Sequence, residues 1–379
     1  MKVLSDTEEG KRVSDIIIEQ KTRYHLSNSD IAILYRTNAQ SRVFEEYLRR
    51  QNINYRVFGG TSFYQRKEIK DLIAYLRLTV NHKDEEALKR VINYPKRGIG
   101  KTTVEKLTAL AASTNQILWD CLDQLQVPAR TQGLLKGFKL LVSTFSQRAK
   151  TSDAYELANY IARQSGIIKV LKADTSVEGL GRLENVTSLL DGIKEFVEND
   201  EVIEGQIEND KSLATYLQNI ALHTNMDEEE DGNFVTLMSV HSAKGLEFKS
   251  VFVVGLEETL FPSFMSMKST TAIEEERRLF YVSITRAEEF LTLTFANSRY
   301  RHGKTVYSEP SRFLSEIPLD HIESTNFSRN EPSERNIVPR ARVSGGFKKR
   351  RTEAVLKINP DDFRPVSYTH LTLQTNREV

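Results

Sequence analysis

The sequence has a single cysteine, Cys121, among its 379 residues. One thiol excludes a disulfide framework and fits a reducing compartment, so the sequence predicts a cytoplasmic protein. Long hydrophobic runs are also missing, since no stretch reaches the roughly 18 apolar residues of a membrane-spanning helix. The first residues lack the pattern of a signal peptide. We therefore expect no membrane among the partners of this protein.

Charge of one sign is equally scarce, because 53 basic residues are balanced by 52 acidic ones and leave a formal net charge of +1. Such a balance gives no general attraction to nucleic acid, so any binding of nucleic acid must come from local patches. With 39% hydrophobic and 28% charged residues, the composition is typical of a globular protein with a highly charged surface.

Strand and helix patterns alternate at both ends of the globular part and indicate a parallel sheet covered by helices. Helical periodicity dominates between them, which predicts an α/β domain interrupted by an all-helical inserted domain. We predict a first α/β part at residues 1–88, the inserted helical domain at 89–230, a second α/β part at 231–320 and a disordered basic tail at 321–379. The acidic run at 227–233 is interpreted as a linker, and the end of the tail could be foreign sequence.

A true phosphate loop is missing as well. The segment "NYPKRGIGKT" contains Gly100-Lys101-Thr102, but Pro95 occupies the position at which the loop requires a glycine. Proline has no N–H and fixes φ, so the loop would lose a phosphate donor and its ability to curl. A second Gly-Lys-Thr, at 303–305, has Ser298 at the same position. The sequence therefore predicts no ATP-binding phosphate loop in this chain.

Polar residues that follow apolar strands are candidates for a ligand site, since parallel sheets bind ligands at strand ends. In "ILYRTNAQSR", Tyr35 could stack on a base and Arg36 could bind phosphate oxygens. In "VTLMSVHSAKGLEF", a hydroxyl and an ammonium group beside Gly245 suit a phosphate, while the carboxylate of Glu247 suits a ribose hydroxyl. A structural Tyr-Arg pair and a plain polar crossover loop remain the alternatives.

The segment "EEERRLFYVSITRAEE" predicts a helix with Arg286 just beyond its far end. An arginine held rigidly at the end of an element can place positive charge on a transferring phosphoryl group. We interpret the charged residues from Glu274 to Arg278 as surface pairs along this helix.

Five segments taken together resemble, in order and spacing, the C-terminal half of the UvrD/Rep/PcrA superfamily-one DNA helicases. They are "ILYRTNAQSRVFEEYL", "GGTSFYQRKEIKDLIAYLRL", "YPKRGIG", "VTLMSVHSAKGLEF" and "EEERRLFYVSITRAEE". The resemblance covers roughly residues 2–318. It implies the second RecA-like domain of such a helicase, a P-loop NTPase fold without its own P-loop, interrupted by the inserted helical domain. The activity it implies is that of an ATP-dependent 3′–5′ helicase or translocase in DNA repair or replication.

The resemblance also implies roles for individual residues. Tyr35 would stack on adenine, Arg36 and Arg286 would reach the γ-phosphate, and Glu247 would contact the nucleotide sugar. Lys244 and Gly245 would bind the nucleotide, and Lys244 would also help to couple the nucleotide site to the DNA site. The residues expected on DNA are His241 and Ser242 for the single strand, and Arg97, Gly98, Gly100, Lys101 and Thr102 for duplex phosphates. A plain tight turn at "RGIG" is the alternative.

The first RecA-like domain of the family, which carries the phosphate loop and the Mg²⁺-binding Asp-Glu pair, is not found in this sequence. "VVGLEE" at 253–258 imitates the Asp-Glu motif, but no phosphate loop accompanies it. We therefore expect ATP with Mg²⁺ as the cofactor, metal ligands only on the missing domain, and no hydrolysis by the isolated chain. The expected partners are single-stranded DNA, duplex DNA and the missing N-terminal RecA-like domain.

Two other functions stay open. The chain could be a non-hydrolysing DNA-binding or regulatory module, or half of a helicase–nuclease.

Overall fold

The structure is a computed structural model that describes residues 1–198, 210–224, 232–301 and 304–323. Most of the predicted linker at 227–233, residue Gly303 of the second Gly-Lys-Thr and nearly all of the predicted tail at 321–379 lie outside these residues.

The α/β part is built on a five-stranded sheet in which every neighbouring pair of strands is parallel, with the order β3-β4-β2-β5-β6. Its strands are β2 (Ile31–Tyr35), β3 (Tyr55–Val57), β4 (Val235–Ser239), β5 (Phe248–Val253) and β6 (Ala287–Leu293). Strands from the two ends of the sequence thus alternate in one sheet. The predicted α/β class with a parallel sheet is confirmed.

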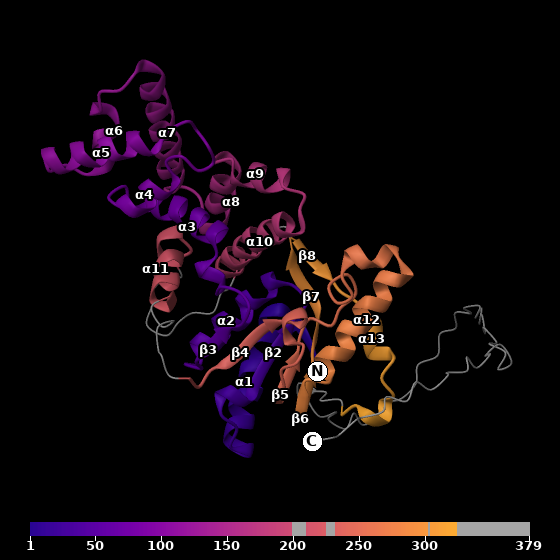
Figure 1. Cartoon of the computed structure of the whole chain (residues 1–379). Helices are drawn as coiled ribbons and strands as arrows, with labels where there is room; N and C mark the ends of the chain where they lie inside the picture. The colour runs from indigo at the N-terminus through magenta and orange to yellow at the C-terminus, as the bar shows by residue number, and fades with distance from the viewer. Residues whose placement is uncertain (199–209, 225–231, 302–303, 324–379) are drawn as a thin grey trace, which may run out of the picture. The chain divides into compact units, whose positions relative to one another are not determined.

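Helices cover both faces of this sheet, and the apolar strand β2 shows why. All five of its residues are buried, and its side chains alternate between two cores. Ile31, Ile33 and Tyr35 pack with α1 (Asp6–Tyr24) and α2 (Ser41–Arg50). Ala32 and Leu34 pack on the opposite face, with Phe280 of α12 (Thr270–Ile284) and Phe313 of α13 (Arg312–Ser315). Figure 1 shows the two helix layers on either side of the strands.

A second, three-stranded sheet has the order β1-β7-β8 and consists of β1 (Lys2–Ser5), β7 (Phe295–Arg301) and β8 (Lys304–Tyr307). Arg299 of β7 holds it against the rest of the α/β part. The guanidinium of Arg299 lies 2.6 Å from a carboxylate oxygen of Glu9 and 2.7 Å from one of Glu257, and both carboxylates are fully buried. The "VVGLEE" segment therefore supplies a structural carboxylate, Glu257, for a buried ion network.

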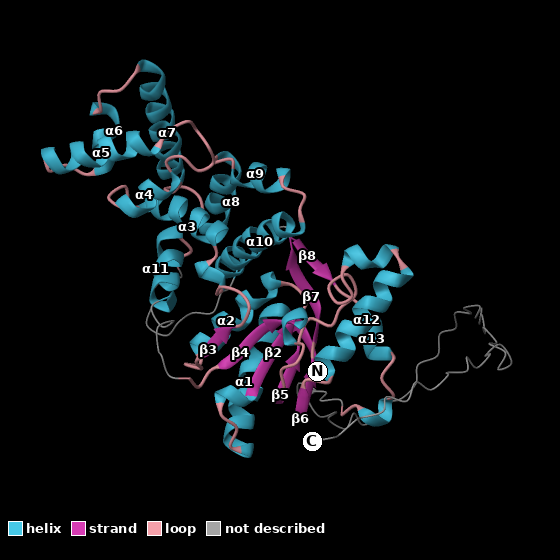
Figure 2. Ribbon diagram, viewed as in Figure 1, coloured by secondary structure: helices cyan, strands magenta, loops and turns pink. Residues whose placement is uncertain are grey.

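The helical part lies between β3 and β4 in the sequence (Figure 2). Its helices are α3 (Lys67–Val80), α4 (Glu85–Val91), α5 (Lys101–Thr114), α6 (Leu118–Gln124), α7 (Ala129–Arg148), α8 (Ala154–Gln164), α9 (Ile167–Ala173), α10 (Val177–Glu198) and α11 (Leu213–Thr224). A single hydrophobic core runs through them, from Phe63 to Tyr216, and includes the buried Cys121. Because α3 shares this core, we propose that the inserted domain begins near Phe63, earlier than the predicted residue 89.

Replacement of Arg299 by leucine should destabilise the protein strongly, because it leaves Glu9 and Glu257 as buried carboxylates without their common cation. Removing one partner of a buried ion pair costs about 3–5 kcal/mol, which urea denaturation can measure. Arg278→Leu is the matched control. Arg278 is 73% exposed and pairs with Glu275, so its loss should cost less than about 1 kcal/mol. Equal effects of the two changes would contradict this account of the network.

Candidate functional site

The carboxyl ends of β3, β4 and β2 lie side by side, because these three neighbouring strands are parallel. Each strand leads directly into a candidate segment. β2 is followed by Arg36, β4 by the short 3-10 helix η4 (Val240–Ala243) with His241, and β3 by the "FGGTS" loop at 58–62. We call this side of the sheet the carboxyl edge.

Arg36 is held at the carboxyl edge by a buried carboxylate. Its Nε and Nη2 atoms donate to Glu276 of α12 at 2.9 and 2.6 Å. Glu276 is 3% exposed and also accepts hydrogen bonds from the backbone N–H of Ser263 and the hydroxyl of Ser266. Burial alone would raise the pKa of Glu276, but the bonds and charge of Arg36 outweigh it and lower that pKa. The pair therefore stays ionised at neutral pH.

His241 lies exposed on the same edge, close enough to Arg36 to be affected by its charge. Loss of hydration lowers the pKa of His241, and the positive charge of Arg36 lowers it further. Ser242 follows it, and its hydroxyl lies 3.0 Å from that of Ser239. The structure thus brings together Arg36, His241 and Ser242. Of these, Arg36 was predicted on ATP and the other two on single-stranded DNA.

Tyr35 is 1% exposed and packs in the core beneath α1 and α2. Burial raises its pKa well above the ordinary range of a tyrosine. The ring has no accessible face on which adenine could stack, because Tyr35 lies on the face of β2 that α1 and α2 cover, together with Ile31 and Ile33. The structure therefore gives no support to the expected stacking, and Tyr35 has the structural role that was its alternative.

Glu247 and Arg286 lie at the amino ends of strands β5 and β6, which we call the amino edge. The segment from His241 to Glu247 leaves β4 at the carboxyl edge and enters β5 at Phe248, on the amino edge. Arg286 lies there too, between the end of α12 and the start of β6, and its carbonyl accepts from the Phe248 N–H. The two motifs meet directly, since Nη1 of Arg286 donates to the Leu246 carbonyl at 3.1 Å.

The side chain of Arg286 is half-buried and fixed by three neutral acceptors. Its Nε donates to the Val282 carbonyl, its Nη1 to the Leu246 carbonyl and its Nη2 to the Thr285 hydroxyl. These bonds use three of the five N–H groups of a guanidinium and leave one on each terminal nitrogen. Among the residues that the structure describes, Arg286 is therefore an oriented cation without a carboxylate partner, which suits an anionic ligand.

Lys244, Gly245 and Glu247 are all exposed, and they flank Leu246, whose carbonyl binds Arg286. Gly245 has a φ of +85°, a conformation that side chains rarely adopt. Lys244 and Glu247 lie in one crossover segment, and Arg286 lies in the turn that contacts this segment. Together they offer an ammonium, a carboxylate and a guanidinium group. They could accommodate the phosphates and the sugar hydroxyls of a nucleotide.

Arg36 and Arg286 do not lie together, although both were expected on the γ-phosphate. One follows the end of β2 and the other precedes the start of β6. These positions are separated by about the length of β5, whose six residues span about 20 Å at roughly 3.3 Å each. Helix α12 connects the two places, because Glu276 contacts Arg36 and Val282 contacts Arg286.

The "RGIG" loop opens helix α5, and the structure divides its predicted DNA ligands into two groups. Gly98 has a φ of +85°, while a Cβ at Gly100 would meet no atom within 4 Å. Lys101 is 92% exposed and Thr102 is exposed beside it. Gly100 caps α5 without a side-chain bond to its N–H groups, so the helix start favours an anion.

Arg97, by contrast, points into the protein. Its guanidinium donates to the carbonyls of Val91, Tyr94, Pro95 and Ser165. It also lies over the rings of Tyr75 and Phe138, within 5.7 and 5.6 Å of their centroids. This arginine closes the loop from within, because the carbonyls of the α4 end need a donor. The expectation that Arg97 contacts DNA phosphates is not supported.

Glu276 is the functional candidate that the sequence interpretation missed. Its neighbours do make the expected surface pairs, Glu274 with Arg277 and Glu275 with Arg278. Glu276 lies on the buried side of the same helix. A third consecutive glutamate must face a different direction from the first two on a helix, which was the signal available in the sequence.

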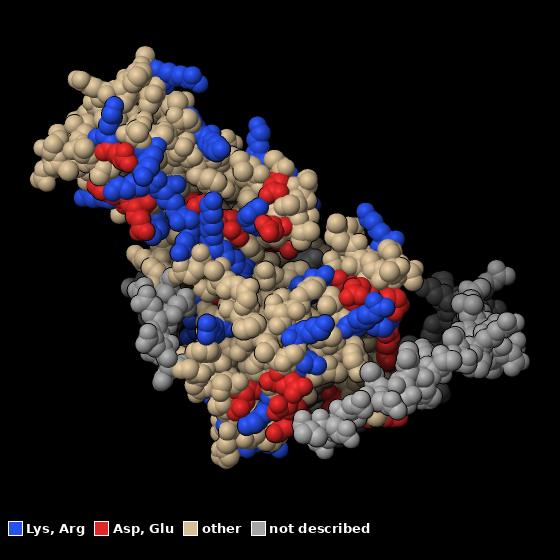
Figure 3. Space-filling model, viewed as in Figure 1, with Lys and Arg blue, Asp and Glu red and all other residues tan. Residues whose placement is uncertain are grey.

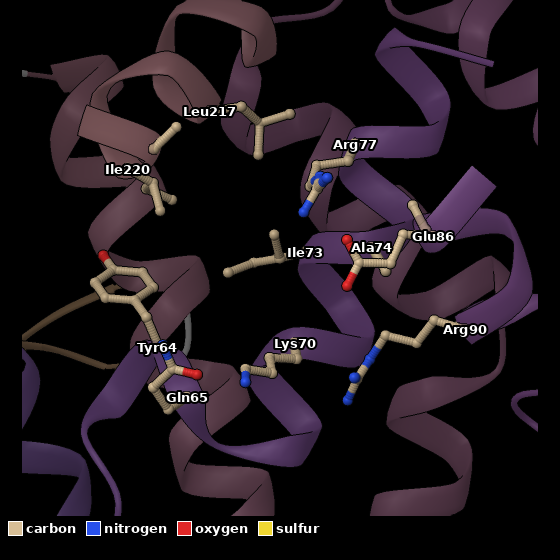
Figure 4. A pocket seen from close by; sticks show the side chains of 12 residues that line it. Tyr64, Gln65, Lys70, Ile73, Ala74, Arg77, Glu86, Arg90, Leu217 and Ile220 are labelled. Carbon is tan, nitrogen blue, oxygen red and sulfur yellow. The ribbon is translucent and has the colours of Figure 1, made fainter. Parts of the chain in front are cut away.

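A pocket of about 480 Å³ lies in the helical part, between α3, α4 and α11 (Figure 4). Ile73, Leu217 and Ile220 line its apolar side, and the cationic groups include Arg77 and Arg90. Figure 3 shows Lys and Arg side chains gathered over α3 and α4. Both arginines are paired, Arg77 with Asp84 and Arg90 with Asp71. The residues that line this pocket belong to neither the carboxyl edge nor the amino edge of the sheet.

A metal-ion cluster and a membrane-spanning helix are both absent from residues 1–198, 210–224, 232–301 and 304–323. No three His, Cys, Asp or Glu side chains in those ranges are placed to hold a metal ion. Within the same ranges, every helix is too short or too polar to cross a bilayer.

The sequence matches the family model of the UvrD-like helicase C-terminal domain over residues 2–298, which is most of the chain. The chain belongs to this family. The UvrD-like match spans both α/β parts and the helices between them, so the RecA-like fold with its insertion is a property of the family domain.

Curated relatives of this UvrD-like domain include the ATP-dependent DNA helicases PcrA of three bacteria. The protein of Staphylococcus epidermidis is 38% identical over 341 residues, which cover 89% of this chain and 45% of that protein. The protein of Bacillus subtilis is 41% identical over 324 residues, or 82% and 43%. That of Staphylococcus aureus is 38% identical over 342 residues, or 88% and 45%. The chain thus spans less than half the length of these relatives.

Replacing Glu276 by glutamine should lower stability at neutral pH by about 1.5–3 kcal/mol, since charge-assisted bonds to Arg36 are lost. The pKa of Glu276 is lowered from 4.5 in the folded protein. Its stabilising contribution is therefore fully present above about pH 4.5 and is lost as the pH falls through the folded pKa. Urea denaturation of both proteins at pH 7 and at lower pH tests this. A difference that stays constant or grows in acid would contradict it.

Proposed function

We propose that this chain is the C-terminal half of an ATP-dependent 3′–5′ DNA helicase that acts in DNA repair or replication. It would supply the second half of the ATP site and part of the DNA track. The observation that carries the proposal is the arrangement of two polar edges on one parallel sheet, joined by helix α12. Membership of the UvrD-like family and the similarity to PcrA helicases support it.

The amino edge is the proposed nucleotide side. Arg286 would donate to the terminal phosphate with its remaining N–H groups, and Glu247 would accept from a sugar hydroxyl. Lys244 and Gly245 lie in the segment that crosses to the other edge, which fits a coupling role. The phosphate loop and the Mg²⁺ ligands would come from the N-terminal half, the expected partner domain. When bound with Mg²⁺, ATP supplies the phosphoanhydride whose hydrolysis drives movement.

The carboxyl edge is the proposed side for single-stranded DNA, and we assign Arg36 to it instead of to the nucleotide. Arg36 lies with His241 and Ser242, whereas a sheet length separates it from Arg286. An arginine, a neutral histidine and hydroxyl groups can all bind phosphate and sugar oxygens of DNA.

Helix α12 provides a direct mechanical link between these two sides. A shift of Arg286 on contact with a phosphate would move the same rigid helix that carries Glu276, and so Arg36. Two sites that bias one rigid element can be coupled energetically.

Duplex DNA is the proposed ligand of the "RGIG" loop. Lys101 and Thr102 are exposed at the start of α5, and the backbone at Gly100 is open to close approach. Arg97 keeps the loop in shape rather than binding the phosphates itself.

Arg286→Ala and Arg36→Ala should impair different activities of a helicase completed with its N-terminal half. Loss of Arg286 should reduce ATP turnover about 10³-fold, as loss of an arginine finger does, with little change in affinity for single-stranded DNA. Loss of Arg36 should weaken that affinity and reduce the slope of log K against log salt by about 0.7, since one phosphate contact is lost. Steady-state ATPase assays and salt titrations distinguish them. Normal turnover of Arg286→Ala would remove that residue from the nucleotide site.

Lys101→Ala should weaken duplex binding equally across sequences and reduce its salt slope by about 0.9. Arg97→Ala should instead lower the free energy of unfolding, because four carbonyls lose their donor. Fluorescence anisotropy on two unrelated duplexes, together with urea denaturation, measures both effects. An unchanged salt slope for Lys101→Ala would argue against the DNA role of the loop.

A further inference from the structure

We propose that Phe58 and Phe264 are base-stacking residues at the carboxyl edge, one on each side of Arg36 and His241. This inference rests on the proposed binding of single-stranded DNA at that edge. It goes beyond it, because it adds recognition of the bases to recognition of the phosphates.

Both phenylalanines are far more exposed than the aromatic residues of the cores. Phe264 is 60% exposed and Phe58 is 47% exposed, whereas Phe252, Phe261 and Phe313 are fully buried. An isolated exposed apolar residue is ordinary in a folded protein. Two exposed aromatic rings that border the same polar site indicate a binding role. Aromatic rings on which bases stack, next to groups that bind the backbone, are typical of sites for single-stranded nucleic acid.

Phe264 is placed next to Arg36 by the carboxylate that binds both of their segments. Ser263 and Ser266 donate to Glu276, and Glu276 binds Arg36. The Phe264 N–H is itself bonded to the Thr259 carbonyl. The backbone that carries the ring is thus fixed on both sides within one short 3-10 helix, η5 (Phe264–Lys268), while the ring remains open to solvent.

Phe58 is placed on the other side, where β3 ends. Its N–H donates to the Leu237 carbonyl of β4. The next residue, Gly59, has a φ of +71°, and a Cβ there would lie 3.2 Å from the hydroxyl oxygen of Ser242. The loop therefore lies against the segment that carries His241. In the strand order β3-β4-β2, Phe58 and Arg36 are two strands apart, or about 10 Å.

The charges of Arg36 and His241 at the carboxyl edge are too few to account for the proposed affinity for single-stranded DNA, so another interaction must contribute to it. Arg36 is already paired with Glu276, and the lowered pKa of His241 keeps that ring mostly neutral at pH 7. These two described residues therefore offer the strand little unpaired positive charge. Stacking on aromatic rings binds bases without regard to their charge or sequence, so it can supply the missing affinity.

The test uses the full 379-residue chain and two single-stranded oligonucleotides of equal length, oligo(dT) and a strand of the same backbone with abasic sites. Phe264→Leu and Phe58→Leu keep an apolar side chain but remove the planar ring. Each should weaken binding to oligo(dT) roughly 5- to 150-fold, the range for loss of one stacked base. Neither should change binding to the abasic strand or the salt slope. Phe264→Tyr should restore affinity, because it keeps the ring.

Leu140→Ala is the control, since Leu140 is a 70% exposed apolar residue on α7 of the helical part. It should leave both affinities unchanged. Equal binding of oligo(dT) by wild type, Phe58→Leu and Phe264→Leu would overturn the stacking inference and leave the proposed DNA edge standing. An equal loss on both strands would also overturn it, because it would indicate a general distortion. Failure of the unchanged chain to bind either strand would overturn the DNA edge as well.

Discussion

Burial of the parallel sheet on both faces is the constraint on which the rest of the structure depends. Strands such as β2 have no face free for polar groups, since α1 and α2 cover one side and α12 and α13 the other. Polar groups that serve a ligand beside β2 must therefore lie beyond the ends of this strand. Arg36 and His241 appear at one end, and Arg286 and Glu247 at the other. The placement of the two proposed ligand sites at opposite edges follows from this packing.

Ion pairs with buried carboxylates then fix the positions of the charged groups. Glu276 orients Arg36 from within α12, and Glu9 with Glu257 binds Arg299 and so joins the two sheets. A buried carboxylate requires a cation and hydrogen-bond donors, so each of these residues has little freedom to move. Arg286 differs, because neutral carbonyl and hydroxyl oxygens hold it. Within the described part of the chain, that difference leaves the charge of Arg286 without a paired carboxylate.

Packing also decides which candidate residues are exposed and which are buried. Arg286, Lys244 and Glu247 lie in polar segments that border apolar strands, and the hydrogen bond from Arg286 to the Leu246 carbonyl joins the two segments. Tyr35 also borders the end of an apolar strand and Arg97 flanks the glycines of its loop, yet both side chains turn inward. A tyrosine at the last position of a strand points to either face depending on parity and on the helices that cover it. An arginine beside a turn bonds whichever acceptors are nearest, and those of Arg97 are the carbonyls of its own loop.

The sequence by itself determined the α/β class, the insertion of helices between strands and the membership of the UvrD-like family, because periodicity and motif order are local properties. It also determined which polar segments follow which strands. Only the tertiary structure decided that Arg36 and Arg286 lie at opposite edges. Strand order and direction are set by the packing of segments more than 200 residues apart, such as β2 and β5. The buried pairing of Arg36 with Glu276, 240 residues away, depends on the same long-range packing.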